Sequence, residues 1–271
     1  MSNAAIGFFD SGLGGLTVRQ EVIQLLPNES TIYLADSAHA PYGEKTRAGI
    51  LERSRLNTEW LLGQGCKLIV IACNTATTNA IAVLRDEYTI PFVGIEPAIK
   101  PAALNSESKS VGVLATRGTL SSALFASTSR MYSAGIEVLE QEGTGLVGLI
   151  ESGQLSHPKT KAHLKRLLAP MLEAGIDHLV LGCTHYPLLI PQLKEILPEH
   201  VQIVDCSPAV ALQTQAVLTQ NNLLNSGQIP GAHAVFTNGN PEIANDMLER
   251  LGHGRDCLLY TSDAADDNRL V

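Results

Sequence analysis

The chain has few aromatic residues, no long apolar run and no cluster of cysteine and histidine at metal-ligand spacing. Its apolar runs reach about seven residues, whereas a membrane-spanning helix needs roughly 20. The N-terminus also lacks the basic and then apolar pattern of a signal peptide. We therefore expect a cytoplasmic protein with no membrane and no metal among its partners.

Cysteine and positive charge are also scarce. The 271 residues include five cysteines at irregular spacing, so we expect reduced thiols rather than a disulfide framework. The formal charge of −8 and the lack of clustered lysine and arginine argue against a nucleic-acid partner. No lysine adjoins a phosphate-cradling loop, which argues against pyridoxal phosphate. With 45% apolar residues, the chain can bury one large or two medium cores.

An apolar run that ends on a cysteine occurs twice. Residues 69–75 read IVIACNT and residues 179–185 read LVLGCTH. Aligned on the cysteines without gaps, the sequences before them also share a leucine, a glycine and a valine. We interpret this similarity as an internal repeat in which each copy supplies one cysteine, Cys73 or Cys183.

A second similarity supports the repeat. Residues 111–116 (VGVLAT) resemble residues 6–11 (IGFFDS), although Ala115 stands where the first copy has Asp10. Apolar strands that alternate with helical spacing predict parallel sheets with helices on both faces. We therefore predict an α/β fold with two lobes and an active site in the cleft between them, at the carboxyl ends of the strands.

The first predicted strand ends in a glycine-rich turn at residues 10–15 (DSGLGG). A dinucleotide-binding motif that starts at Gly12 would require glycine in place of Thr17, and Asp10 would repel a pyrophosphate. A tight turn without further function would leave unexplained why a carboxylate and a hydroxyl end a strand at the open edge of a sheet. We therefore take Asp10 and Ser11 as candidate site residues.

Two thiols that face each other across a cleft can carry out two-base racemisation. One thiolate removes a proton from a tetrahedral carbon, and the opposite thiol supplies a proton to the other face. Cys73 precedes a predicted helix at residues 75–87, so we expect the helix N-terminus to lower the pKa of its thiol. We expect Asp10 to assist Cys73, and His185 to form hydrogen bonds on the side of Cys183.

Each candidate also has a purely structural interpretation. A buried cysteine usually contributes only to packing, and Cys66 and Cys206 keep that interpretation. Glu151 follows an apolar run and is either a catalytic group or a solvated helix residue. Three polar neighbours of the cysteines could serve only as helix caps, namely Asn74, Thr75 and Thr184.

The C-terminal residues do not fit the repeat. Residues 257–266 (CLLYTSDAAD) resemble the translation of a transposon-based sequencing adapter. We therefore predict that residues 257–271 are a non-native tail, and we exclude them, Cys257 included, from fold and function. A natural disordered tail is the alternative.

The motifs of the chain resemble those of the glutamate racemases, within the aspartate/glutamate racemase superfamily. They are DSGLGGLT at 10–17, PYGE at 41–44, ACNTA at 72–76, GCTHYP at 182–187 and TNGNP at 237–241. The resemblance implies interconversion of L- and D-glutamate for peptidoglycan synthesis, without a cofactor. It also implies that Cys73 and Cys183 are the acid and base residues.

The same resemblance implies two pseudo-symmetric flavodoxin-like lobes, residues 1–97 with 208–256 and residues 98–207, and a homodimer. It implies substrate contacts from Asp10, Ser11, Tyr42, Gly43, Asn74, Thr75, Thr116, Thr119, Thr184 and His185. His39 stands where the family often has arginine, which puts a contact from that position in doubt. Residues 238–240 also differ from the usual Thr-Gly-Asp of the family.

Several other functions stay open on the sequence alone. An aspartate racemase or a broad amino-acid racemase would keep both thiols, so only the pocket for the substrate side chain would distinguish these enzymes from a glutamate racemase. A one-thiol decarboxylase acting on malonates is disfavoured because Cys183 is present, and a Cys-His hydrolase would leave the second thiol without a role. A binding module that acts on a protein such as DNA gyrase would suit the acidic charge, but no segment marks such a surface.

Overall fold

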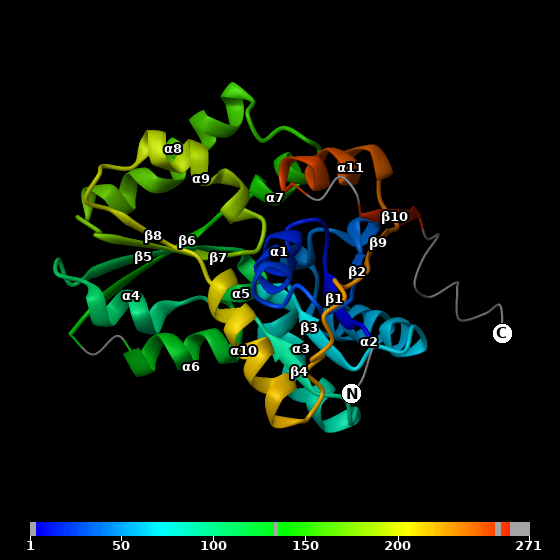
Figure 1. Cartoon of the computed structure of the whole chain (residues 1–271). Coiled ribbons are helices and arrows are strands. Elements are labelled where there is room, and N and C mark those ends of the chain that lie inside the picture. The colour runs from blue at the N-terminus through cyan, green and yellow to red at the C-terminus, as the bar shows by residue number, and fades with distance from the viewer. Residues whose placement is uncertain (1–3, 133–134, 253–255, 261–271) are drawn as a thin grey trace.

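The computed structural model describes residues 4–132, 135–252 and 256–260 of the chain. These residues form two parallel β-sheets, one of six strands and one of four, each covered by helices (Figure 1). The α/β fold with two lobes is therefore confirmed. We call the parts around the six-stranded and four-stranded sheets the first and second lobes.

Strands and helices alternate along most of the chain. The strands of the first lobe are β1 (Ile6–Asp10), β2 (Thr31–Ala35), β3 (Leu68–Ile71), β4 (Phe92–Gly94), β9 (His233–Thr237) and β10 (Cys257–Tyr260). Its helices are α1 (Leu16–Leu25), α2 (Arg47–Gly63), α3 (Asn74–Glu87), α10 (Ser207–Gln220) and α11 (Pro241–Arg250), with 3-10 turns η1 (Ser37–His39) and η2 (Tyr42–Glu44).

The second lobe is built in the same way from the middle of the chain. Its strands are β5 (Ser110–Ala115), β6 (Glu137–Glu142), β7 (His178–Gly182) and β8 (Gln202–Val204). Its helices are α4 (Ile99–Asn105), α5 (Arg117–Leu120), α6 (Ala123–Tyr132), α7 (Leu146–Glu151), α8 (Pro158–Glu173) and α9 (Ile190–Ile196), with a 3-10 turn η3 (Tyr186–Leu189).

The two lobes share a strand order and a register. The order is β2-β1-β3-β4 in the first lobe and β6-β5-β7-β8 in the second. Phe8 lies beside Val70 in the first lobe, and Val113 lies beside Val180 in the second. These residues are the ones that the sequence repeat aligns, so the repeat is confirmed as a structural one. In each lobe the chain order reverses beside the first strand, and such a point leaves a crevice at the carboxyl ends of the strands.

Neighbouring residues of each central strand fill cores on opposite faces of the sheet. In β1, Phe8 belongs to the core that includes α1, α10 and α11, whereas Phe9 belongs to the core with α2 and α3. In β5, Leu114 packs with α8 and α9, and Val113 packs with α4 and α6. Burial of both faces explains why these strands are continuously apolar in the sequence.

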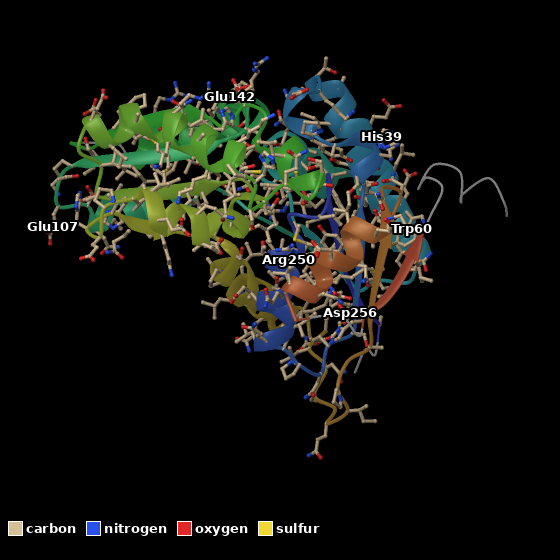
Figure 2. All side chains as sticks on the ribbon, turned by 90° about the horizontal axis from the view of Figure 1, so that it is seen from above. His39, Trp60, Glu107, Glu142, Arg250 and Asp256 are labelled. Carbon is tan, nitrogen blue, oxygen red and sulfur yellow. The ribbon has the colours of Figure 1, made fainter. Side chains whose placement is uncertain are left out.

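The first lobe is formed from two separate parts of the chain. After β4 the chain enters the second lobe, and it returns with α10, which packs against α1, and with β9, which pairs with β2. Figure 2 shows Glu107 at the outer end of the second lobe and Trp60 at the opposite end of the molecule. The residues at which the lobes divide stay a prediction. Within the described residues, no helix is both long and apolar enough to cross a membrane.

One expectation from the sequence needs correction. Residues 257–260, which we excluded from the fold, form β10 beside β9. An edge strand presents unpaired backbone groups that such a segment can satisfy.

The origin of the C-terminal residues is a separate question from their position. Residues 261–271 lie outside the described part of the chain. The pairing of β10 with β9 therefore corrects the exclusion of four residues from the fold. The adapter origin of the tail stays a prediction.

Candidate active site

The two repeated cysteines lie after equivalent strands, Cys73 after β3 and Cys183 after β7. Both side chains are buried and line one small pocket. The pocket is lined by Ser11, Pro41, Tyr42, Gly43, Cys73, Asn74, Thr75, Thr116, Val147, Cys183, Thr184 and His185. Of the expected site residues, Asp10, Thr119 and Glu151 lie behind this lining, and Pro41 and Val147 were not expected.

Cys73 is held by groups of the first lobe. Its Sγ accepts a hydrogen bond from Ala76 N at 3.5 Å, at the N-terminus of α3, and donates to Ser11 Oγ at 3.7 Å. The backbone N–H and the hydroxyl of Ser11 donate to Asp10 Oδ1 at 2.7 and 3.3 Å. Asp10 is fully buried, and its Oδ2 accepts a hydrogen bond from Gly15 N at 2.7 Å. Asp10 therefore reaches Cys73 through Ser11.

The expected direction of the Cys73 pKa shift is wrong. Burial raises the pKa of this thiol well above its ordinary value, and the charge of Asp10 raises it further. Hydrogen bonds from Ala76 and Ser11 lower this pKa but do not offset the burial. The position at the helix N-terminus is confirmed, but the buried Cys73 is held as the thiol, which is the proton-donating form.

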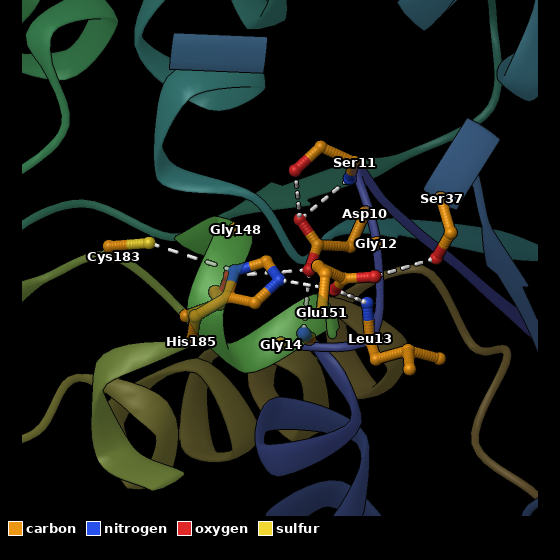
Figure 3. A network of polar contacts seen from close by, with 12 residues as sticks. Asp10, Ser11, Gly12, Leu13, Gly14, Ser37, Gly148, Glu151, Cys183 and His185 are labelled. Carbon is orange, nitrogen blue, oxygen red and sulfur yellow. Dashed lines mark hydrogen bonds and ion pairs between the residues drawn. The ribbon is translucent and has the colours of Figure 1, made fainter. Parts of the chain in front are cut away.

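Cys183 has different neighbours, which belong to the second lobe. Its Sγ lies 3.7 Å from Nδ1 of His185. The other ring nitrogen of His185, Nε2, lies 2.6 Å from Oε1 of Glu151 at the end of α7. Figure 3 shows these three side chains in a row. The side chain of Glu151 is 14% exposed, so it is not a solvated surface residue.

The charges on the two sides of the pocket also differ. Burial alone would lower the pKa of His185, but its contacts with Cys183 and Glu151 raise it well above the ordinary value. Burial would raise the pKa of Glu151, but hydrogen bonds from His185 and from Leu13 help to lower it. Burial raises the pKa of Asp10 despite the nearby charge of His185. The Cys183 side therefore holds an imidazolium–carboxylate pair, whereas on the Cys73 side both oxygens of the buried Asp10 accept backbone hydrogen bonds.

The glycine-rich turn after β1 packs directly against this ion pair. A Cβ at Gly12 would lie 2.3 Å from Glu151 Oε1, and a Cβ at Gly14 would lie 2.5 Å from His185 Nδ1. Leu13 N, between these glycines, donates to Glu151 Oε1 at 2.6 Å. Glycine is thus required here for the close approach of the two lobes.

Hydroxyl groups connect the lobes at two further places. Thr184 Oγ1 donates to Asp10 Oδ2 at 3.3 Å. Thr75 Oγ1 of the first lobe lies 2.7 Å from Thr116 Oγ1 and 3.3 Å from Thr119 Oγ1 of the second lobe. Because a hydroxyl can rotate, these three threonines can turn their donors toward a carboxylate.

Asn74 presents an acceptor without a partner. Its Nδ2 donates to Ile95 O at 3.5 Å, whereas its buried Oδ1 has no hydrogen-bond partner among the described residues. A buried acceptor left unpaired costs about 1–3 kcal/mol. This oxygen therefore suits a ligand that brings a donor, such as an ammonium group.

Tyr42 lines the pocket, but its hydroxyl is used elsewhere. The hydroxyl donates to Asp36 Oδ2 and accepts a hydrogen bond from Asn57 Nδ2 at 3.0 Å. His39 Nδ1 lies 2.9 Å from Asp36 Oδ1, and Arg53 donates to both oxygens of Asp36. His39 is thus directed to Asp36 and is not among the pocket-lining residues.

The sequence analysis missed Ser37 as a site residue. Ser37 follows the end of β2, and its Oγ donates to Glu151 Oε2 at 3.0 Å. The available signal was its position in a loop after a parallel strand, at the same sheet edge as Asp10. The contact itself crosses between lobes, so no local pattern in the sequence predicts it.

Cys66 and Cys206 are buried thiols that do not line the pocket. Burial raises the pKa of Cys66 and of Cys206 to about 12, as expected of thiols that only pack. In the described part of the chain, no group of three or more His, Cys, Asp or Glu residues could hold a metal ion. The pocket and the residues directly behind it present thiols, carboxyls, an imidazole and hydroxyls.

A family model and individual relatives assign the chain to the same family. Residues 16–214 match the family model described as Asp/Glu/Hydantoin racemase. A glutamate racemase from Pseudomonas aeruginosa is 50% identical over 229 residues, which cover 84% of this chain and 86% of the relative.

Solved structures of similar proteins agree with this match. Escherichia coli glutamate racemase in complex with L-glutamate and the activator UDP-MurNAc-ala has a TM-score of 0.84 at 33% identity, covering 95% of this chain and 98% of that one. The Francisella tularensis glutamate racemase in complex with D-glutamate has a TM-score of 0.82 at 30% identity, covering 96% of this chain and 97% of that one.

The chain therefore belongs to the Asp/Glu/Hydantoin racemase family. Its two-lobed α/β fold and its interlobe pocket with two thiols fit that class of enzyme. Within the family it groups with the glutamate racemases, which confirms the resemblance that the motifs carry.

Proposed function

We propose that this enzyme interconverts L- and D-glutamate for peptidoglycan synthesis, without a cofactor, with Cys73 and Cys183 as opposed acid and base. The observation that carries the proposal is that both thiols line one buried pocket from equivalent strand ends of two lobes. The relatives named as glutamate racemases support the choice of substrate.

The proposed reaction moves one proton off Cα and another onto it. One cysteine, as the thiolate, takes the Cα proton, and the electrons of the broken C–H bond delocalise into the adjacent carboxylate. The opposite thiol then gives its proton to the other face of Cα. The first cysteine ends as the thiol and the second as the thiolate, so the reverse reaction exchanges their roles.

Each thiol has its own assisting group in this proposal. Asp10 acts on Cys73 through Ser11, whose hydroxyl donates to Asp10 Oδ1 and accepts a hydrogen bond from Cys73 Sγ. The protonated His185 donates a hydrogen bond toward the sulfur of Cys183 when that sulfur carries negative charge, and Glu151 keeps the imidazole charged. Both arrangements are preorganised by the closed lobes, so little rearrangement is needed during the reaction.

The pocket offers groups for each end of an amino acid. The unpaired Oδ1 of Asn74 suits the ammonium group. The hydroxyls of Thr75, Thr116 and Thr119 suit a carboxylate. Polar groups at both ends of the pocket suit a small dicarboxylic amino acid.

The test is an enantiomer assay with purified protein, L-glutamate, D-glutamate and L-aspartate, and no added cofactor. We expect both glutamate enantiomers to approach an equal mixture while aspartate stays unchanged. Faster racemisation of aspartate would instead indicate an aspartate or broad-specificity racemase. No racemisation of any of them would contradict the proposal.

We also propose that the enzyme acts in the cytoplasm as a homodimer, with residues 1–97 and 208–256 as one lobe and 98–207 as the other. The family resemblance of the motifs supports this assignment. Light scattering after size-exclusion chromatography should give twice the mass of 28.9 kDa. A single 28.9 kDa species over the whole concentration range would contradict the dimer.

A further inference from the structure

Glu151 lies at the boundary of the two lobes and is held mainly from the opposite one. It ends α7 of the second lobe, yet two of its hydrogen bonds come from the first lobe. Leu13 N donates to Oε1 at 2.6 Å, and Ser37 Oγ donates to Oε2 at 3.0 Å. Figure 3 shows Ser37 and Leu13 to the right of this carboxylate and His185 to its left. The first lobe therefore fixes both oxygens of a side chain that it does not carry.

The third partner of the same carboxylate is His185. Oε1 of Glu151 lies 2.6 Å from His185 Nε2, and the other ring nitrogen faces Cys183 at 3.7 Å. A carboxylate held by donors on both oxygens cannot rotate freely, so the ring that it binds is also fixed in orientation. The hydroxyl of Ser37 thus lies three contacts away from the sulfur of Cys183.

The loop that carries Ser37 is itself held by the segment between β9 and α11. Asn238 Oδ1 accepts a hydrogen bond from Ala38 N at 2.9 Å, and Asn238 Nδ2 donates to Asp36 Oδ1 at 2.7 Å. A Cβ at Gly239 would lie only 2.5 Å from Ser37 Cβ. Asn238 and Gly239 therefore form the wall behind Ser37.

We propose that Ser37 is a positioning residue for the Cys183 side of the reaction, and that Asn238 and Gly239 hold it in place. Its hydroxyl orients Glu151, which orients His185 toward Cys183. Because the contact joins the two lobes, the Cys183 side is assembled only when the lobes are closed. The inference rests on the proposed racemase reaction.

The test compares Ser37→Ala with the hydroxyl-retaining Ser37→Thr. We expect Ser37→Ala to lower the racemisation rate roughly tenfold, as the loss of one hydrogen bond to a charged group does. With Cα-deuterated L- and D-glutamate, the isotope effect on kcat/KM should rise in the direction in which Cys183 is the base. In the opposite direction, in which Cys73 is the base, this isotope effect should fall. Ser37→Thr should restore both values.

A matched control is Ser152, which follows Glu151 at the C-cap of α7. Ser152 is exposed, and its hydroxyl donates to Gly148 O rather than to the carboxylate of Glu151. Ser152→Ala should leave the rate and both isotope effects unchanged. Equal losses in Ser37→Ala and Ser37→Thr, or isotope effects that stay as in the unaltered enzyme, would overturn the proposal.

A second measurement does not need turnover. Carbon-13 NMR of the Glu151 carboxyl should show its pKa higher in Ser37→Ala, because one of the hydrogen bonds that lower it is lost. Such a shift in a protein without racemase activity would support the positioning contact and contradict the proposed function. An active enzyme in which neither the pKa nor the isotope effects change would contradict the positioning role alone.

Discussion

The two lobes share a scaffold but differ in the groups beside their cysteines. Both have the same strand order and register, and both place a cysteine after the third strand of the repeat. In the first lobe the sulfur of Cys73 meets a hydroxyl and, behind it, the buried Asp10. In the second lobe the sulfur of Cys183 meets His185, which is paired with Glu151.

This difference shows that the repeat determines where the two cysteines lie but not which groups assist them. At the position of Asp10 the second lobe has Ala115, so the assisting group of the second thiol has to come from elsewhere. It comes from the residues after β7 and from α7, and the first lobe completes it through Leu13 and Ser37. The two sides of the pocket are therefore similar in backbone and unlike in electrostatics.

The largest expected effect is the loss of either thiol. Cys73→Ala and Cys183→Ala should each lower racemisation by at least about a thousandfold, because each removes a proton donor and acceptor that the other cannot replace. The enantiomer assay measures both. Cys206→Ala is the matched control, since that thiol is buried but does not line the pocket. Racemisation retained in either single-thiol variant would contradict the requirement for one thiol on each side of the pocket.

The next effect separates the two assisting groups. Asp10→Asn and His185→Gln should each reduce kcat about tenfold to a hundredfold, since each leaves the thiol in place but removes the group that tunes it. Deuterium isotope effects measured in both directions should shift in opposite senses in the two variants. Shifts in the same sense would mean that both groups serve the same thiol.

A smaller effect is expected at the threonine cluster that joins the lobes. Thr116→Val removes one donor and should raise KM for glutamate about tenfold while kcat changes little. Steady-state kinetics give both constants. Thr219→Val, at an exposed position on α10, should change neither. A fall in kcat without a change in KM would place Thr116 in the proton transfer rather than in binding.

The smallest effect concerns a carboxylate far from the pocket. Partial burial raises the pKa of Asp177, but hydrogen bonds from His178, Ser108 and Ser106 lower it well below its ordinary value. Its contribution to stability is therefore present above the unfolded pKa of about 3.9 and is lost as the pH falls through the lower folded pKa.

The substitution Asp177→Asn measures this contribution. It should cost about 1 kcal/mol or less at pH 7, because the site is partly screened by solvent, and less at pH 2. Thermal unfolding at the two pH values, with the exposed Asp86→Asn as control, gives the difference. A cost that is equal at both pH values would show that the hydrogen bonds do not depend on the charge.

Much of the scaffold could be predicted from the sequence. Apolar strands followed by small polar residues indicated the parallel sheets, and the match around Cys73 and Cys183 indicated the repeat, because both signals are local. The rest depends on contacts between distant segments. Ser37 meets Glu151 only because the lobes close, and the pKa of Cys73 rises because of burial that helix position alone does not reveal.

The end of the chain gives a similar lesson. The resemblance of residues 257–266 to a translated sequencing adapter led us to exclude residues 257–271 from the fold, but a sheet edge can accept a segment that supplies backbone hydrogen bonds. Residues 257–260 therefore occupy the edge beside β9. The resemblance concerns the origin of the segment, which stays a prediction, and not its place in the sheet.

The most direct test of the two-thiol account is the fate of the Cα hydrogen at low conversion in heavy water. Because one thiol removes the proton and the other supplies a different one, the D-glutamate formed from L-glutamate should carry deuterium at Cα. The remaining L-glutamate should stay protonated. Nuclear magnetic resonance of the separated enantiomers measures both. Product that retains the original hydrogen would show that a single base handles both faces, and would contradict the account.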